Sequence, residues 1–182
     1  IVWFRQDLRL ADNPAVQAAL VHKLPIIPVF IEDTETKAPY SNGGGATRWW
    51  LHHSLAKLAK DLETCGSRLI LKRGSPRKVL ADLAAEAGAQ FLHWNRCYEP
   101  HVISRDTEVK QSLVKQGLQV SSHNGSLLCE PWEIQTKTGG PYQVFTPFSR
   151  AVREHPVPAP LPAPRKLPAP EEWPSTLKLE EF

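Results

Sequence analysis

The sequence predicts an α/β fold built on a five-stranded parallel sheet. Short apolar runs, typical of buried strands, alternate with stretches whose apolar residues recur at helical spacing. The connections are short, and several carry a helix-capping residue or a helix-ending glycine. Strands that alternate with helices in this way favour a parallel sheet covered by helices on both faces.

The first unit of this pattern is residues 1–14, where a strand, a charged turn and a capped helix follow one another. Asp12 or Asn13 can cap a helix that has Pro14 at its first position, where no amide donor is needed. Ligands of open parallel sheets bind beyond the carboxyl ends of the strands. The charged turn at residues 5–9 therefore lies at a candidate functional edge, although a purely structural ion-pair cluster explains the same charges.

The later elements repeat the pattern. Strands are expected at residues 1–4, 25–31, 68–72, 90–94 and 118–122, and helices at residues 15–23, 46–65, 76–87 and 101–116. Ser75 is expected to cap the third helix. In the second helix, Leu51, Leu55, Leu58 and Leu62 form one apolar stripe. The alternating strands and helices of residues 1–122 therefore predict a Rossmann-like α/β core.

The pattern changes after residue 122. Residues 123–154 predict loops and a short helix, capped by Thr146, that complete the domain. Eight of the twenty residues 155–174 are proline, which favours an extended, semi-rigid chain. Residues 155–182 are therefore interpreted as a proline-rich interdomain linker, and Trp173 and the tail after it are expected to approach a further domain.

Composition limits the function classes. A formal net charge of +3 on 182 residues is too small to indicate a nucleic-acid partner by itself. The three cysteines are widely spaced and form neither a disulfide framework nor a metal-ligand pattern, which favours a reducing, cytoplasmic setting. No apolar stretch reaches the length of a membrane span, so no membrane partner is expected.

No catalytic nucleophile–base arrangement or metal-ligand spacing is visible in the sequence. The run Gly43-Gly44-Gly45 lacks the lysine and spacing of a phosphate-binding loop and is interpreted as a lead-in to the second helix. Asp106, with Arg105 beside it, is expected to form an internal ion pair or a cap rather than a catalytic group.

Two groups of residues are candidates for a binding site. At the start of the second helix, Arg48 borders the leucine stripe, whereas Trp49 lies about 160° from Leu51 and needs a planar ligand, another domain or a neighbouring loop as a cover. The second group, residues 95–100, brings an amide, a thiol, a phenol and a carboxylate to the end of the fourth strand. Arg48 and Glu99 are expected to face each other across a crevice, unless they form an ordinary salt bridge.

Five segments in order resemble the DNA photolyase/cryptochrome family, in its amino-terminal α/β domain. They are VWFRQDLRLADNPAV, ATRWWLHHSLAKL, FLHWNRCYEP, NGSLLCEPWEI and GGPYQVFTPFSRA. Together they cover nearly the whole chain up to the proline-rich segment. The resemblance is closest to bacterial cyclobutane pyrimidine dimer photolyases and to plant-cryptochrome-like sequences.

The resemblance implies a monomeric flavoprotein that uses light to split pyrimidine dimers in damaged DNA. Flavin adenine dinucleotide (FAD) would bind a helical carboxyl-terminal domain, which this sequence lacks, so the chain alone is not expected to be catalytic. The amino-terminal domain would hold an antenna chromophore, which is a methenyltetrahydrofolate, a deazaflavin or a second flavin depending on the member.

By the same resemblance, the antenna crevice would be lined by residues of three segments. These are Ile31, Glu32 and Asp33 after the second strand, Arg48 with the loop before it, and Asn95, Cys97 and Glu99. Arg48 and Glu99 would be polar anchors and Asn95 an edge contact. Cys97 replaces a polar residue found in several relatives, so the chromophore stays open, with folate preferred. The turn at 5–9 and residues 145–150 would instead support the contact with the carboxyl-terminal domain.

Two other functions fit the same residues. One is a cryptochrome photoreceptor that uses this domain without DNA repair. The other is a stand-alone nucleotide-binding module with no light function, against which the proline-rich segment argues. The features that separate repair from signalling lie beyond residue 182.

Overall fold

Five parallel strands form one sheet in the order β3-β2-β1-β4-β5 in a computed structural model that describes residues 1–35 and 44–182. The strands are β1 (Val2–Phe4), β2 (Pro28–Asp33), β3 (Ile70–Gly74), β4 (Phe91–Asn95) and β5 (Gln119–His123). Each begins one to three residues later than the sequence predicts, because buried apolar residues such as Ile26 and Leu69 precede the hydrogen-bonded ladder. The parallel sheet with its helices confirms the predicted fold class.

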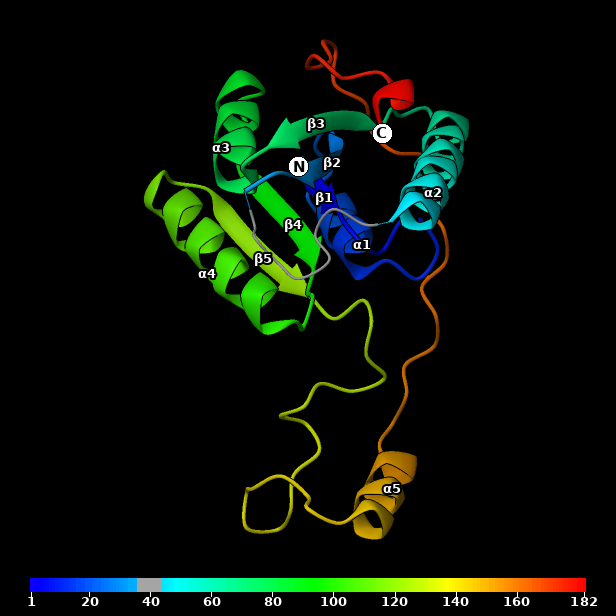
Figure 1. The fold of residues 1–182 in the computed structure, drawn as a ribbon, viewed down its shortest axis with the longest axis vertical. Coiled ribbons are helices and arrows are strands. Elements are labelled where there is room, and N and C mark those ends of the chain that lie inside the picture. The colour runs from blue at the N-terminus through cyan, green and yellow to red at the C-terminus, as the bar shows by residue number, and fades with distance from the viewer. Residues whose placement is uncertain (36–43) are drawn as a thin grey trace.

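Four helices cover the two faces of the sheet (Figure 1). Helices α1 (Pro14–Val21) and α2 (Gly45–Thr64) lie on one face, and α3 (Pro76–Glu86) and α4 (Pro100–Lys115) lie on the other. Successive side chains of a strand point to opposite faces, so Phe4 packs with α1 and α2 while Trp3 packs with α3 and α4. In α2 the predicted stripe is buried at Leu55, Leu58 and Leu62.

Helix capping follows the sequence at some ends only. Asn13, not Asp12, caps α1, and its Oδ1 accepts a hydrogen bond from the Val16 amide at 3.2 Å. Ser75 stands at the cap position of α3, but its side chain makes no capping hydrogen bond. Helix α5 (Phe145–Glu154) starts before Thr146, so Thr146 is not its cap. Pro147 is tolerated because amides of the first turn need no helical acceptor.

The segment after β5 leads away from the sheet to α5, which stands apart from the α/β core (Figure 1). No residue of α5 is buried, although the helix carries Phe145 and Phe148 on its surface. Residues 123–154 contribute no side chain to the two hydrophobic clusters that flank the sheet, although Ile134 and Glu130 are themselves buried. Within the described ranges, no helix combines the length and apolar character that crossing a membrane requires.

Residues 161–182, here called the strap, return along the core instead of leading away as a free spacer would (Figure 1). The Leu161 carbonyl accepts from the Asp12 amide at 2.8 Å, and the Leu167 amide donates to the Cys65 carbonyl at 2.9 Å. Leu167 is 1% exposed and belongs to the core beneath α1 and α2. Prolines cannot donate, but their carbonyls accept, as Pro168 does from the Ile26 amide at 2.8 Å.

The end of the strap covers the outer edge of β3. The Leu71 amide donates to Thr176 Oγ1 at 2.8 Å, and the Leu177 amide donates to the Leu71 carbonyl at 2.9 Å. The short 3-10 helix η1 (Leu179–Glu181) follows, and the tail packs on the core beside Phe30. Trp173 packs against the core on the α3 and α4 side. Trp173 and the tail therefore complete the core of this chain and protect its sheet edge, and their approach to a further domain stays a prediction.

Removing the strap's buried side chain should destabilise the whole domain. We expect Leu167→Ala to lower the free energy of unfolding by about 2–4 kcal/mol, because it leaves a cavity in the core. Val157→Ala, at an exposed position of the same proline-rich segment, should change it by less than about 0.5 kcal/mol. Urea denaturation measures both, and equal effects of the two variants would show that the strap is a free linker.

Candidate functional site

A cavity of about 650 Å³ opens at the carboxyl edge of the sheet, beside β1. The strand order reverses at this strand, since β2 lies on one side of it and β4 on the other. Such a switch point is where open α/β sheets bind ligands. The cavity is lined by Trp3, Arg5, Gln6, Leu8, Arg9, Phe30, Ile31, Thr47, Trp50, Leu51, Ser54, Cys97, Val102 and Arg105. Its volume lies within the range of small-molecule sites.

The walls of this cavity combine aromatic and aliphatic side chains with hydrogen-bond donors. Apolar walls come from β1, β2, α2 and α4, and the polar groups are guanidinium, amide, hydroxyl and thiol groups. Among the described lining residues there is no carboxylate. Such a surface suits a flat heteroaromatic ligand whose edge carries hydrogen-bond acceptors.

A chain of ion pairs lies beneath the cavity. Asp106 pairs with both Arg5 and Arg105, and Arg105 Nη1 also lies 3.0 Å from Asp33 Oδ2. This confirms the prediction of an internal ion pair for Asp106. Both guanidinium groups also lie against the ring of Trp3, with their central carbons 4.7 and 5.2 Å from its centroid. These ion pairs fix the ends of β1 and β2 relative to α4.

A second polar network closes the other side of the β1 turn. Buried Asp7 accepts from the Asn13 and Asn95 side chains at 3.3 and 2.6 Å and from the Arg5 amide at 2.9 Å. Arg9 donates to backbone carbonyls, including that of Gly125 at 2.8 Å. The charges of the β1 turn are therefore largely structural, and several of its side chains also line the cavity.

Asn95 belongs to this network and not to the lining. Its Nδ2 donates to Asp7 and to Asn13 Oδ1, and its Oδ1 accepts from the Ala15 amide at 3.1 Å. The backbone at Gly125 covers it closely, since a Cβ there would lie 2.5 Å from Asn95 Cγ. In this structure Asn95 therefore has no polar group left over for the predicted edge contact with a ligand, because both groups of its buried side chain are already bonded.

Arg48 and Glu99 do not form the expected facing pair. Neither lines the cavity, and no ion pair joins them in the described part of the chain. Glu99 Oε1 accepts from Gln6 Nε2 at 3.0 Å, and this bond holds the pKa of Glu99 below its usual value. Arg48 is exposed, next to the lining residue Thr47.

The other predicted residues divide between lining and support. Cys97 and Ile31 line the cavity, and burial raises the pKa of the Cys97 thiol. Asp33 supports the site through Arg105. Glu32 pairs with Arg73 of β3, outside the lining. Part of the loop expected to line the site before Arg48, residues 36–43 with Gly43, lies outside the described residues.

Several lining residues escaped the sequence analysis. Trp50 and Ser54 are four residues apart on α2, and Val102 and Arg105 are three apart on α4, so each pair presents one helix face to the cavity. Trp49 points away from the leucine stripe, as predicted, and is 62% exposed. Helical spacing in the sequence indicates that the residues of each pair share a helix face. It does not indicate that these faces of α2 and α4 line the same cavity.

Comparisons with known proteins agree with this architecture. Residues 1–166 match the family model described as DNA photolyase. The chain belongs to the DNA photolyase family. It is 48% identical over 183 aligned residues to a deoxyribodipyrimidine photo-lyase of Agrobacterium fabrum, covering 100% of this chain and 37% of that protein. It is 41% identical to cryptochrome-2 of Arabidopsis thaliana, over 81% of this chain and 24% of the relative.

A solved structure shows the same fold in this family. The crystal structure of a bacterial class III photolyase from Agrobacterium tumefaciens superposes with a TM-score of 0.91 at 48% identity, over 99% of this chain and 37% of that one. This photolyase-family chain thus spans a little over a third of the length of both Agrobacterium relatives.

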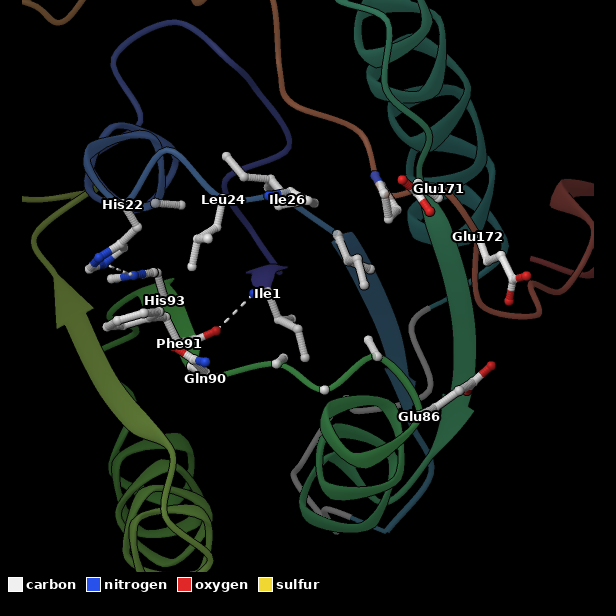
Figure 2. Close-up of a pocket in the computed structure, with 17 residues that line it drawn as sticks. Ile1, His22, Leu24, Ile26, Glu86, Gln90, Phe91, His93, Glu171 and Glu172 are labelled. Atoms are coloured by element: carbon white, nitrogen blue, oxygen red, sulfur yellow. Dashed lines mark hydrogen bonds between the residues drawn. The ribbon is translucent and has the colours of Figure 1, made fainter.

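The photolyase-family chain has a second cavity, of about 510 Å³, at the opposite, amino edge of the sheet. His22, Phe91 and His93 gather on one side of it, and Glu171 and Glu172 of the strap stand on the other (Figure 2). This cavity lies away from the carboxyl ends of the strands, where ligands of such sheets bind.

Three histidines form a hydrogen-bonded row that starts at this second cavity. His22 Nε2 and His93 Nε2 are 3.2 Å apart, and His93 Nδ1 lies 3.2 Å from His123 Nε2. Burial lowers the pKa of His93 to about 4, with smaller contributions from the two neighbouring imidazoles and the amino group of Ile1. His93 is therefore a neutral, internal link between α1, β4 and β5.

We expect Asn95→Ala to lower the free energy of unfolding by about 3 kcal/mol, because it leaves the buried Ala15 amide without its partner and removes the 2.6 Å hydrogen bond to buried Asp7. Asn124→Ala is the matched control, since that half-buried side chain bonds only within its own turn, to the Ser126 and Leu127 amides and the Leu127 carbonyl. Its cost should stay below about 1 kcal/mol in urea denaturation. An Asn95 variant as stable as the control would contradict the buried network.

Stability should also depend on the protonation of His93. The unfolded state takes up this proton near pH 6.5 and the folded state only near pH 4, so stability is complete above 6.5 and is lost as the pH falls toward 4. The loss from this residue is at most about 3 kcal/mol. Urea denaturation between these pH values should give a flatter profile for His93→Gln, and identical profiles would rule out a neutral, buried His93.

Proposed function

We propose that this chain is the amino-terminal, antenna-pigment-binding domain of a light-dependent deoxyribodipyrimidine photo-lyase, an enzyme that splits cyclobutane pyrimidine dimers. The observation that carries the proposal is the cavity at the switch point beside β1, with aromatic walls and donor groups. The family membership and the photo-lyase name of the 48% identical relative support it. The chain itself has no part in the electron chemistry of repair.

The pigment we favour for this cavity is methenyltetrahydrofolate, with a deazaflavin or a flavin as alternatives. When bound, such a pigment absorbs light and passes the excitation to FAD in another domain. The cavity is lined by residues of α2 and α4, and its donor groups complement the acceptor edge of a heteroaromatic ring. Exposed Arg48, next to the lining residue Thr47, would pair with a carboxylate such as that of the folate tail.

The roles of the candidate residues follow from their positions. Cys97 would contact the pigment directly, and Arg48 would act at the mouth of the cavity. Glu99 and Asp33 would position the lining residues Gln6 and Arg105, to which they bond. Asn95 and Glu32 would have no contact with the pigment.

A further domain of the same polypeptide would complete the protein. The chain spans 37% of its Agrobacterium relative, and the remainder would hold FAD in a helical domain and contact damaged DNA. Large apolar side chains stand exposed on α5 and the loops beside it: Leu128, Trp132, Val144, Phe145, Phe148 and Val157. We propose that this helical domain covers them in a monomeric protein, because exposed apolar surface of this extent marks an interaction site.

The second candidate function is a cryptochrome photoreceptor, favoured by the 41% identity to Arabidopsis cryptochrome-2. Illumination of the complete gene product with dimer-containing DNA separates the two. A repair enzyme restores the pyrimidines under blue light, whereas a photoreceptor binds FAD and leaves the dimers intact. A preparation without flavin would contradict both.

Filling the cavity should prevent pigment uptake. Ser54→Phe places a ring in the cavity, and we expect it to weaken methenyltetrahydrofolate binding at least about tenfold, or about 1.4 kcal/mol, in equilibrium dialysis read by pigment absorbance. Thr64→Phe is the matched control on the same helix. Both hydroxyls donate to the carbonyl four residues earlier, at 2.8 and 3.0 Å, but Thr64 lies outside the cavity lining.

The same dialysis tests the pigment class and the role of Arg48. Parallel cells with a deazaflavin and with FMN show which ring the cavity prefers. Arg48→Ala should weaken folate binding severalfold, since the guanidinium would pair with the glutamate carboxylates of folate. If Ser54→Phe does not reduce pigment uptake, the pigment binds elsewhere and the proposed site is wrong.

A further inference from the structure

Trp3 is an unusual wall for a light-absorbing ligand. It lines the cavity but is only 1% exposed, so its indole sits just beneath the proposed pigment. Indole is the most easily oxidised ring among protein side chains, and an excited heteroaromatic pigment is a strong electron acceptor. A tryptophan in this position is therefore expected to donate an electron and quench the excitation.

Two cations lie on the Trp3 ring. The guanidinium carbons of Arg5 and Arg105 are 4.7 and 5.2 Å from its centroid. Their countercharges, Asp106 and Asp33, bond to the guanidinium nitrogens. Removing an electron from the indole would place a positive charge next to both guanidinium groups, in a buried site where charge interactions are weakly screened.

The indole nitrogen of Trp3 removes the second route to oxidation. An oxidised indole is normally stabilised by loss of its N–H proton to an acceptor or to water. Trp3 Nε1 is buried and has no hydrogen-bond partner among the described residues. The two cations therefore disfavour oxidation of the ring electrostatically, and no proton acceptor stabilises the oxidised form.

From these contacts we infer that Arg5 and Arg105 make Trp3 a poor electron donor, so that a pigment excited in the cavity keeps its energy for transfer. The inference rests on the proposed pigment site. The reaction it suppresses moves one electron from the indole of Trp3 to the excited pigment and gives an indole radical cation and a pigment radical anion. Recombination returns the electron and loses the photon's energy as heat.

Trp50 provides the internal comparison. It lines the same cavity, but it is 70% exposed and no cation lies on its ring in the described part of the chain. Any electron-transfer quenching in the unmodified chain should therefore come from Trp50 and not from Trp3. If the arginines had only a structural role, Trp3 and Trp50 would both quench the pigment. Quenching by Trp50 alone therefore supports an electrostatic effect of the arginines on Trp3.

The test measures the fluorescence lifetime of the pigment that this chain retains in the dialysis described above, together with the transient absorption of tryptophanyl radicals. Trp50→Phe should lengthen the lifetime, and Trp3→Phe should leave it unchanged. Arg105→Gln should shorten it at least about twofold and produce a tryptophanyl radical, and adding Trp3→Phe to that variant should abolish both effects. Arg105→Lys, which keeps the cation, is the matched control and should behave as the parent.

Two results would overturn the inference. One is a longer lifetime in Trp3→Phe alone, which needs no Arg105 variant and so holds even if that variant fails to fold. The other is an unchanged lifetime in a folded Arg105→Gln variant that retains pigment. Failure of the proposed site is distinguishable, because the chain would then retain no pigment absorbance, or would retain it undiminished in Ser54→Phe, and the inference would fall with it.

Discussion

The carboxyl edge of the sheet depends on one set of interactions, the ion pairs among Arg5, Asp106, Arg105 and Asp33. They join the end of β1, the end of β2 and the helix α4, three elements that are far apart in the sequence. Buried charges of this kind are costly unless each has a partner, and here each carboxylate accepts from an arginine. Arg5 and Arg105 line the cavity, so the ion pairs that hold these three elements together also fix two of its polar groups in place.

The strap adds a second constraint on the same edge. It is bound along α1, α2 and β3 by backbone hydrogen bonds and by the buried Leu167, and its last residue, Phe182, lies 6.0 Å, centroid to centroid, from Phe30 of the cavity wall. A pigment that transfers excitation needs a fixed distance and orientation relative to its acceptor. Under the proposed function, a strap that lies on the core would hold a following domain closer to the pigment site than a free linker would.

The sequence predicted the parts of the fold that local patterns determine. The leucine stripe of α2 and the Asn13 cap are encoded within a few residues, and both are found. The strap was missed because composition shows that a proline-rich segment is extended but not what it packs against. Its partners, such as the carbonyl of Cys65 for the Leu167 amide, lie about a hundred residues away in the chain.

The site shows the same limit in finer detail. Asn95 is the last residue of β4 and Cys97 lies two residues after it, and the sequence predicted both as lining residues of the binding site. Asn95 is withdrawn from the cavity by Asp7, Asn13 and the backbone of Gly125, while Cys97 remains in the wall. The distinction depends on contacts between distant segments, which no local spacing reveals.

The central claim is the location of the pigment, and a crystal structure of the chain grown with methenyltetrahydrofolate tests it most directly. The account predicts density for the ring between α2 and α4, in contact with Trp50, Cys97 and Val102. Density at the amino edge beside His22 and Phe91, or an empty cavity beside a pigment bound elsewhere, would contradict it.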